Sequence, residues 1–141
     1  MLFDAAVTLN RSHVVVCVAT DPDLLSTIRR LCSGLPCRTV VCERAEDALE
    51  MVGSTGVSLV VADERLGTMS GSRLLREVSR RSPLTARLLL ASETGVRDPH
   101  LEEERPHGVI PNTWNSDSLR RSALAILKWQ EERRSMTEPL A

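Results

Sequence analysis

Aromatic residues and lysine are nearly absent from this chain of 141 residues. The aromatic residues are Phe3, Trp114 and Trp129, tyrosine is missing, and every basic residue except Lys128 is an arginine. Few side chains are therefore available to stack on nucleic-acid bases. The 18 basic and 19 acidic residues leave a net charge of −1, so no overall field draws the chain to DNA, RNA or an anionic membrane. We expect neither direct nucleic-acid binding nor membrane association.

Long apolar runs are also missing. No run approaches the roughly 20 residues needed to cross a bilayer, and no basic segment followed by an apolar one opens the chain. The sequence therefore predicts a cytoplasmic protein. With 42% hydrophobic and 26% charged residues, the composition is that of a folded globular protein. The length fits one domain, which we place at residues 13–134, with flexible ends at 1–12 and 135–141.

The four cysteines lack the pattern of a metal or redox centre. They form no Cys-x-x-Cys pair and have no histidine at ligand spacing: they are Cys17, Cys32, Cys37 and Cys42. Because free cysteine often serves as a small core residue, we expect buried free thiols. A redox role for Cys32 and Cys37 is the alternative.

Five short apolar runs alternate with amphipathic segments. The runs are 14–19, 39–42, 57–62, 88–91 and 109–110. Most are continuous rather than alternating, as in parallel strands that are covered on both faces. They predict a five-stranded parallel sheet whose sites lie at the carboxyl ends of the strands.

The segments between these runs carry apolar residues at helical spacing. The inward-facing positions are Leu24, Leu25, Ile28, Leu31 and Cys32, then Ala45, Ala48, Leu49 and Val52, then Leu74, Leu75 and Val78, and finally Leu119, Ala123, Ile126 and Leu127. The last helix is expected to end near Arg134. A fourth helix, within 93–107, is expected to be short or weak, because two prolines bracket little apolar surface. The alternation predicts a doubly wound α/β fold with right-handed connections.

The carboxyl end of the third run carries the most specific motif. Residues 60–71 read Val-Val-Ala-Asp-Glu-Arg-Leu-Gly-Thr-Met-Ser-Gly, and residues 112–114, after the fifth run, read Asn-Thr-Trp. From about His13 to Arg134 the chain resembles the receiver domain of two-component response regulators. The resemblance implies a flavodoxin-like (βα)5 fold with strand order 2-1-3-4-5. It also implies that Asp63 stands where the family accepts a phosphoryl group with the help of Mg²⁺.

Most of the other positions that serve this chemistry in the family are altered. Ala19 and Thr20 replace an acid pair, which leaves Asp21 as the one acid there, and Asp21 before Pro22 also reads as a helix N-cap. Further along the chain, Ala91 stands where the family has a hydroxyl residue, with Ser92 one position late. Asn112 replaces a lysine, Thr113 a proline and Val109 an aromatic residue. The resemblance is therefore to a degenerate receiver, or pseudo-receiver, for which Mg²⁺ binding is doubtful.

We weigh three functions, none of them enzymatic and none with an assigned cofactor. In the first, the chain acts by binding a protein partner or output domain or by forming a homodimer, with interface candidates on the last helix: Leu124, Trp129, Arg120 and Arg121. In the second, Asp63 is phosphorylated, with Asp21 and Glu64 holding a metal ion. In the third, a small anionic ligand occupies the altered pocket, served by Arg65, Arg87 and Arg97. Asp63 also has a simpler interpretation, as a solvated turn residue.

Overall fold

The structure is a computed structural model that describes residues 9, 12–54, 56–90, 108–110 and 116–137. In chain order its elements are β1 (Val14–Val18), α2 (Pro22–Ser33), β2 (Arg38–Cys42), α3 (Ala45–Ser54), β3 (Leu59–Asp63), α4 (Gly71–Arg81), β4 (Ala86–Leu90), β5 (Gly108–Ile110) and α5 (Ser116–Thr137). Each predicted helical stripe of apolar residues outside 93–107 lies on one of these helices. The predicted helix within 93–107 falls outside the described residues.

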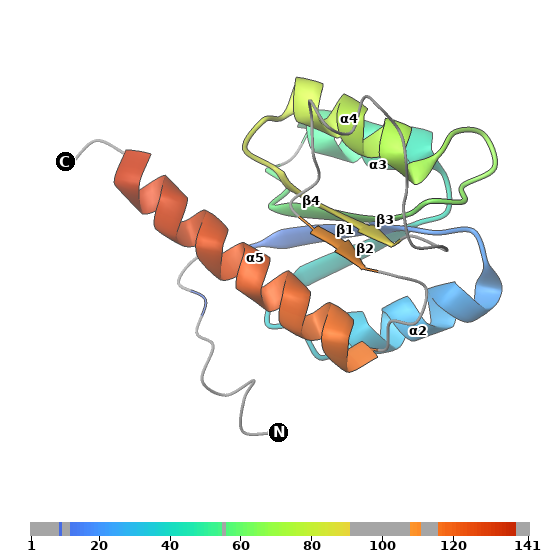
Figure 1. Ribbon diagram of the computed structural model, residues 1–141, viewed down its shortest axis with the longest axis horizontal. Coiled ribbons are helices and arrows are strands. Elements are labelled where there is room, and N and C mark those ends of the chain that lie inside the picture. Colours follow the sequence, from blue (N-terminus) through green and yellow to red (C-terminus); the bar gives the residue numbers. More distant parts are fainter. Residues whose placement is uncertain (1–8, 10–11, 55, 91–107, 111–115, 138–141) are drawn as a thin grey trace.

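The strands pair in parallel in the order β2-β1-β3-β4, and the short β5 pairs with β4. This arrangement is the predicted α/β fold of the flavodoxin-like type. Figure 1 shows α3 and α4 covering one face of the sheet, while α2 and α5 cover the other. The carboxyl ends of β1 and β3 lie side by side, because Val18 pairs with Ala62.

Both faces of the sheet are buried, which explains the continuous apolar runs. On β1, Val15 and Cys17 belong to the core cluster beneath α2 and α5, whereas Val16 and Val18 belong to the cluster beneath α3 and α4. All four side chains are at most 1% exposed. A polar residue at any of these positions would face a helix rather than water.

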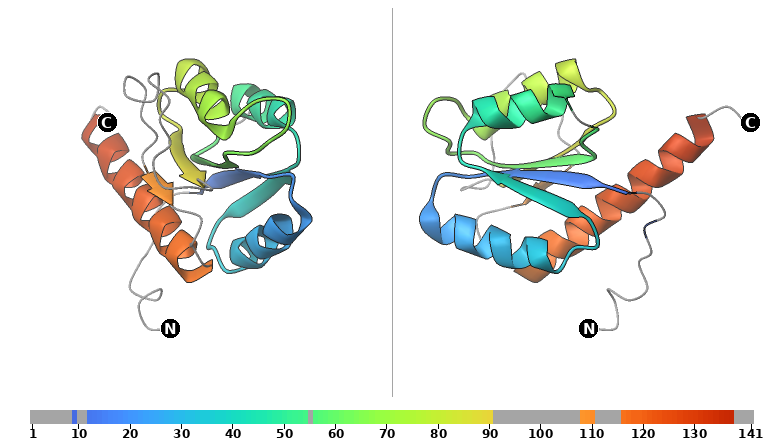
Figure 2. Two further views of the ribbon diagram at one scale, coloured as in Figure 1. Left: turned by 45° about the vertical axis from the view of Figure 1, so that its right-hand side comes forward. Right: turned by 180° about the vertical axis from the view of Figure 1, so that it is seen from behind.

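The last helix is longer than predicted. α5 runs to Thr137, past the expected end at Arg134, and its C-terminal part extends beyond the edge of the sheet (Figure 2). Leu9, which lies in the segment predicted to be a flexible end, packs against the cluster beneath α2 and α5. Within the described residues, no helix is both long and apolar enough to cross a membrane.

The prediction of buried thiols is confirmed for Cys17 and Cys42 but not for Cys37. Cys17 and Cys42 are buried thiols outside any disulfide, and Cys37 is a half-buried one. Burial raises the pKa of the Cys42 thiol, and the charge of Asp47 adds to the rise. This keeps Cys42 in its unreactive protonated form at neutral pH. The side chain of Cys32 lies outside the described part of the chain.

Candidate functional site

Asp63 is the last residue of β3, the strand between β1 and β4. It pairs with Leu90 of β4, and the next backbone N–H, that of Glu64, donates to the Leu90 carbonyl at 3.0 Å. The Asp63 side chain is half-buried. The sequence therefore located the strand end correctly, and Asp63 is more enclosed than a solvated turn residue would be.

Burial raises the pKa of the Asp63 carboxyl, because the charged form loses water. The backbone N–H and the positive charge of Arg65 oppose this rise, while the negative charge of Asp21 adds to it. The net direction is upward. Asp63 is thus a carboxylate whose surroundings only partly compensate its charge.

Replacing Asp63 with asparagine is expected to stabilise the fold at neutral pH. Because the folded-state pKa is raised, the folded protein binds the Asp63 proton more tightly than the unfolded chain does. Ionisation therefore costs stability as the pH rises through the window between the ordinary carboxyl value and the raised one. We expect Asp63→Asn to raise the free energy of unfolding by less than about 1 kcal/mol at pH 7, since the carboxyl is partly solvated. Below that pH window we expect the substitution to leave the free energy of unfolding unchanged.

Urea denaturation at several pH values measures this difference. The control is Asp47→Asn, which removes one exposed negative charge from α3. If Asp63→Asn were less stable than the wild type at pH 7, the carboxylate would be stabilising and our description of its surroundings would be wrong.

Two residues that follow β1 supply no carboxylate to this site. Ala19 is fully buried, and its backbone N–H donates to the Cys42 carbonyl at 3.2 Å. The Thr20 hydroxyl donates to the Arg65 carbonyl at 3.4 Å. A backbone carbonyl oxygen can serve as a ligand of Mg²⁺. The Arg65 carbonyl oxygen already uses one of its two lone pairs to accept the hydrogen bond from Thr20.

Asp21 caps helix α2, as the N-cap interpretation predicts. Its Oδ1 accepts from the backbone N–H of Asp23 at 3.2 Å, and its carbonyl accepts from the N–H of Leu25 at 2.9 Å. These bonds satisfy groups that every helix N-terminus leaves open. The Asp21 side chain thus has a structural task, although its charge still reaches Asp63.

Glu64 is turned toward α4, where both of its carboxylate oxygens accept hydrogen bonds. Its Oε1 accepts from the backbone N–H of Ser72 at 2.9 Å, and its Oε2 accepts from the Ser72 hydroxyl at 2.6 Å. A carboxylate at a helix N-terminus is favoured by the exposed N–H groups and the helix dipole. The hypothesis that Glu64 and Asp21 hold a metal ion stays a prediction, and a metal ion would compete with Ser72 for the Glu64 oxygens. The role of Ser72 was missed in the sequence.

The loop between β3 and α4 is closed by several local bonds. Arg65 and Ser70 form an isolated antiparallel bridge, and the Ser70 hydroxyl caps α4 by accepting from the N–H of Arg73 at 3.1 Å. Gly67 has φ +84°, a left-handed conformation that favours glycine. The N–H of Gly71 donates to the Glu64 carbonyl at 2.9 Å. The loop therefore holds α4 directly against the end of β3.

Known structures match this arrangement, although no protein-family model and no curated protein matches the sequence. The receiver domain of an HD domain-containing protein from Pseudomonas fluorescens has TM-score 0.81 and 24% identity, covering 91% of this chain and 96% of that one. The chain has the receiver-domain fold. A receiver domain from Vibrio parahaemolyticus has TM-score 0.81 and 18% identity over 92% and 100% of the two chains. A CheY-like receiver domain from Methanospirillum hungatei has TM-score 0.79 and 15% identity over 87% and 99%.

Only part of the predicted receiver pocket can be compared with the structure. The predicted positions that lie outside the described residues are Ala91, Ser92, Arg97, Asn112, Thr113 and Trp114. Among the described residues, no three histidine, cysteine, aspartate or glutamate side chains are grouped so that they could hold a metal ion. Arg65 is exposed beside Asp63, but Arg87 is not near it. Arg87 is 8% exposed and pairs with Val60, toward the other end of the sheet.

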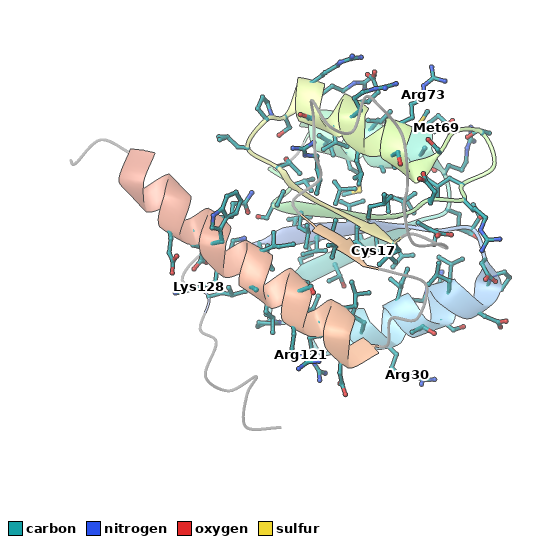
Figure 3. All side chains as sticks on the ribbon, in the orientation of Figure 1. Cys17, Arg30, Met69, Arg73, Arg121 and Lys128 are labelled. Carbon is teal, nitrogen blue, oxygen red and sulfur yellow. The ribbon has the colours of Figure 1, made fainter. Side chains whose placement is uncertain are left out.

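The interface candidates on α5 have different environments in the receiver fold. Leu124 is buried, at 4% exposure, so it is not an outward-facing contact residue as predicted. Arg120 donates to Asp117 at 2.8 Å and lies against Gly34, just after α2. Arg121 is exposed, and Figure 3 shows it on the side of α5 away from the sheet. Trp129 is 39% exposed.

A second polar cluster lies at the amino ends of β1 and β3. The ring of His13 contacts the Ser58 hydroxyl through Nδ1 at 2.8 Å and Oε2 of Glu131 through Nε2 at 2.7 Å. Lys128 lies 3.9 Å from the other Glu131 oxygen. His13, Ser58 and Glu131 are each at most 4% exposed. Because no substrate reaches such closed groups, this cluster is structural, and it ties α5 to the sheet.

Proposed function

We propose that this chain is a degenerate receiver domain of two-component signalling that acts through protein contacts, without Mg²⁺-dependent phosphorylation of Asp63. The observation that carries the proposal is that the side-chain oxygens near Asp63 already form hydrogen bonds within the protein. Glu64 binds Ser72 through both carboxylate oxygens, and Asp21 caps α2. Thr20 donates to a nearby carbonyl oxygen. Asp63 itself accepts from the backbone N–H of Arg65, so each of these oxygen groups already has a contact within the protein.

The chemistry of phosphoryl transfer explains why this matters. An aspartate that attacks a phosphoryl group brings two negative partners together, and a cation with several oxygen ligands normally offsets the repulsion. Mg²⁺ takes near-octahedral oxygen coordination and releases its own water reluctantly. One partly buried carboxylate is a poor site for that ion, and the exposed Arg65 supplies a single positive charge.

The output of such a domain is a protein interaction. We propose a cytoplasmic module whose partner is a second copy of the chain or an output domain. The exposed Trp129 and Arg121 on α5 are surface positions suited to binding an output domain. Aromatic and arginine side chains are enriched at protein interfaces, which supports this assignment.

Incubation with acetyl phosphate and Mg²⁺, followed by intact-mass spectrometry, tests the proposal. We expect no phosphoryl adduct on the wild type. A matched variant is Thr20→Asp, which adds a carboxylate at an exposed position after β1 and is expected to strengthen Mg²⁺ binding measured by calorimetry. A stoichiometric adduct on the wild type that disappears in Asp63→Asn would refute the proposal.

A further inference from the structure

Helices α3 and α4 carry opposite charges on the side that faces away from the sheet. α3 has three carboxylates and no basic residue, a net charge of −3: Glu46, Asp47 and Glu50. α4 has four arginines and one glutamate, a net charge of +3: Arg73, Arg76, Arg80, Arg81 and Glu77. We call the outward side of this helix pair the charged face. All three carboxylates of α3 are exposed, and so are Arg73, Arg80 and Arg81.

The two helices are neighbours and point in the same direction. Each connects two parallel strands, so each runs opposite to the strands, and the two pack against one another on the same side of the sheet (Figure 1). Figure 3 shows Arg73 on the outer side of α4. The charged face is therefore an acidic stripe and a basic stripe lying side by side.

One rotation makes this face complementary to itself. A two-fold axis that lies in the plane of contact and runs along the helices places α3 of one copy over α4 of the other, twice. An axis across the helices would instead place α3 on α3 and α4 on α4, with like charges opposed. A purely acidic partner would use the arginines alone and leave the acidic stripe unmatched.

We propose that a second copy of this chain binds through the charged face, with α3 of each copy on α4 of its partner. This assignment deepens the proposed function by naming its surface and partner. Arginine and carboxylate pairs give geometric specificity through two parallel hydrogen bonds. Contacts between exposed charges are individually weak, so the dimer depends on protein concentration and on salt.

Sedimentation velocity over a range of protein concentrations tests the salt dependence. Raising NaCl from about 0.1 M to about 1 M shortens the Debye length from about 10 Å to about 3 Å and is expected to raise the dimer Kd at least about tenfold. A dimer held by apolar contacts would keep or gain affinity in high salt. A chain that stays monomeric at about 0.1 M NaCl and millimolar protein would overturn the proposal.

Paired charge reversals test the arrangement itself. The first variant, Arg73→Glu with Arg80→Glu, makes both stripes acidic, and the second, Asp47→Arg with Glu50→Arg, makes the face largely basic. Each alone is expected to raise the dimer Kd at least about tenfold, while an equimolar mixture regains affinity because each reversed stripe meets its complement. Thermal unfolding of each variant verifies its folding, and the recovery in the mixture also requires folded partners.

Several results separate this inference from the proposed function. A dimer that neither reversal weakens, or a mixture that fails to recover, overturns the charged face as the interface. If Trp129→Ala abolishes the dimer while both charge reversals leave the dimer Kd unchanged, the contact is assigned to α5 instead. If Mg²⁺ and a phosphoryl mimic alter the dimer Kd through Asp63, the proposed function fails while the charged face stands.

Discussion

Replacing His13 with alanine is expected to lower the free energy of unfolding by about 3 kcal/mol or more. The substitution leaves the Glu131 carboxylate and the Ser58 hydroxyl buried without the ring that joins them. Lys128, at 3.9 Å from Glu131, compensates only part of that charge. A cavity the size of an imidazole adds to the loss. Equilibrium urea denaturation measures the difference.

The His13 ring also links distant parts of the chain. Ser58 precedes β3, and Glu131 lies in the C-terminal half of α5, 118 positions from His13. We therefore expect faster amide hydrogen exchange in that half of α5 in His13→Ala. Ser12→Ala, at an exposed neighbouring position, is the control and is expected to resemble the wild type. A His13→Ala protein within about 1 kcal/mol of the wild type would show that the buried cluster contributes little.

Gly71→Ala is expected to cost about 2–3 kcal/mol or more, because α4 begins directly on the end of β3. A Cβ at Gly71 would lie 2.2 Å from the Asp63 carbonyl oxygen and 2.8 Å from its carbon. Both are backbone atoms, so the strain cannot be relieved by turning a side chain. Either α4 moves away from β3 or the loop opens, and the bonds between Glu64 and Ser72 stretch in both cases.

Gly53→Ala is the matched control for this substitution. Gly53 also lies in a helix, α3, but a Cβ there would meet no atom within 4 Å. Alanine is the better helix former, so we expect this variant to gain up to about 1 kcal/mol. Urea denaturation of both variants gives the comparison. Equal stabilities for Gly71→Ala and Gly53→Ala would contradict the close approach of α4 to β3.

The sheet and most helices could be predicted because their signals are local. Continuous apolar runs placed β1, β2 and β3 within two residues of their observed limits, since strands buried on both faces admit few polar residues. The cap at Asp21 was also visible, because it depends on residues a few positions apart. The C-terminal end of α5 was placed too early, although Pro139, a residue that does not continue a helix, lies two positions past Thr137 in the sequence.

The polar contacts of the site could not be predicted, because they depend on how the chain folds back. Glu64 follows Asp63 directly and so suggested a metal ligand, but the loop that Gly67 allows brings Ser72 to both of its oxygens. His13 had no partner nearby in the sequence, and its two partners come from elements that meet only in the folded sheet. Leu124 suggested an outward contact by its spacing, yet it is buried.

Titration of the wild-type chain with beryllofluoride and Mg²⁺, followed by sedimentation velocity, is the most direct test of a receiver that works without phosphorylation. We expect the dimer Kd and the sedimentation coefficient to stay unchanged up to millimolar Mg²⁺, and Asp63→Asn to behave in the same way. A saturable change in the wild type that is absent from Asp63→Asn would contradict this. It would show that Asp63 still operates a phosphorylation-dependent switch.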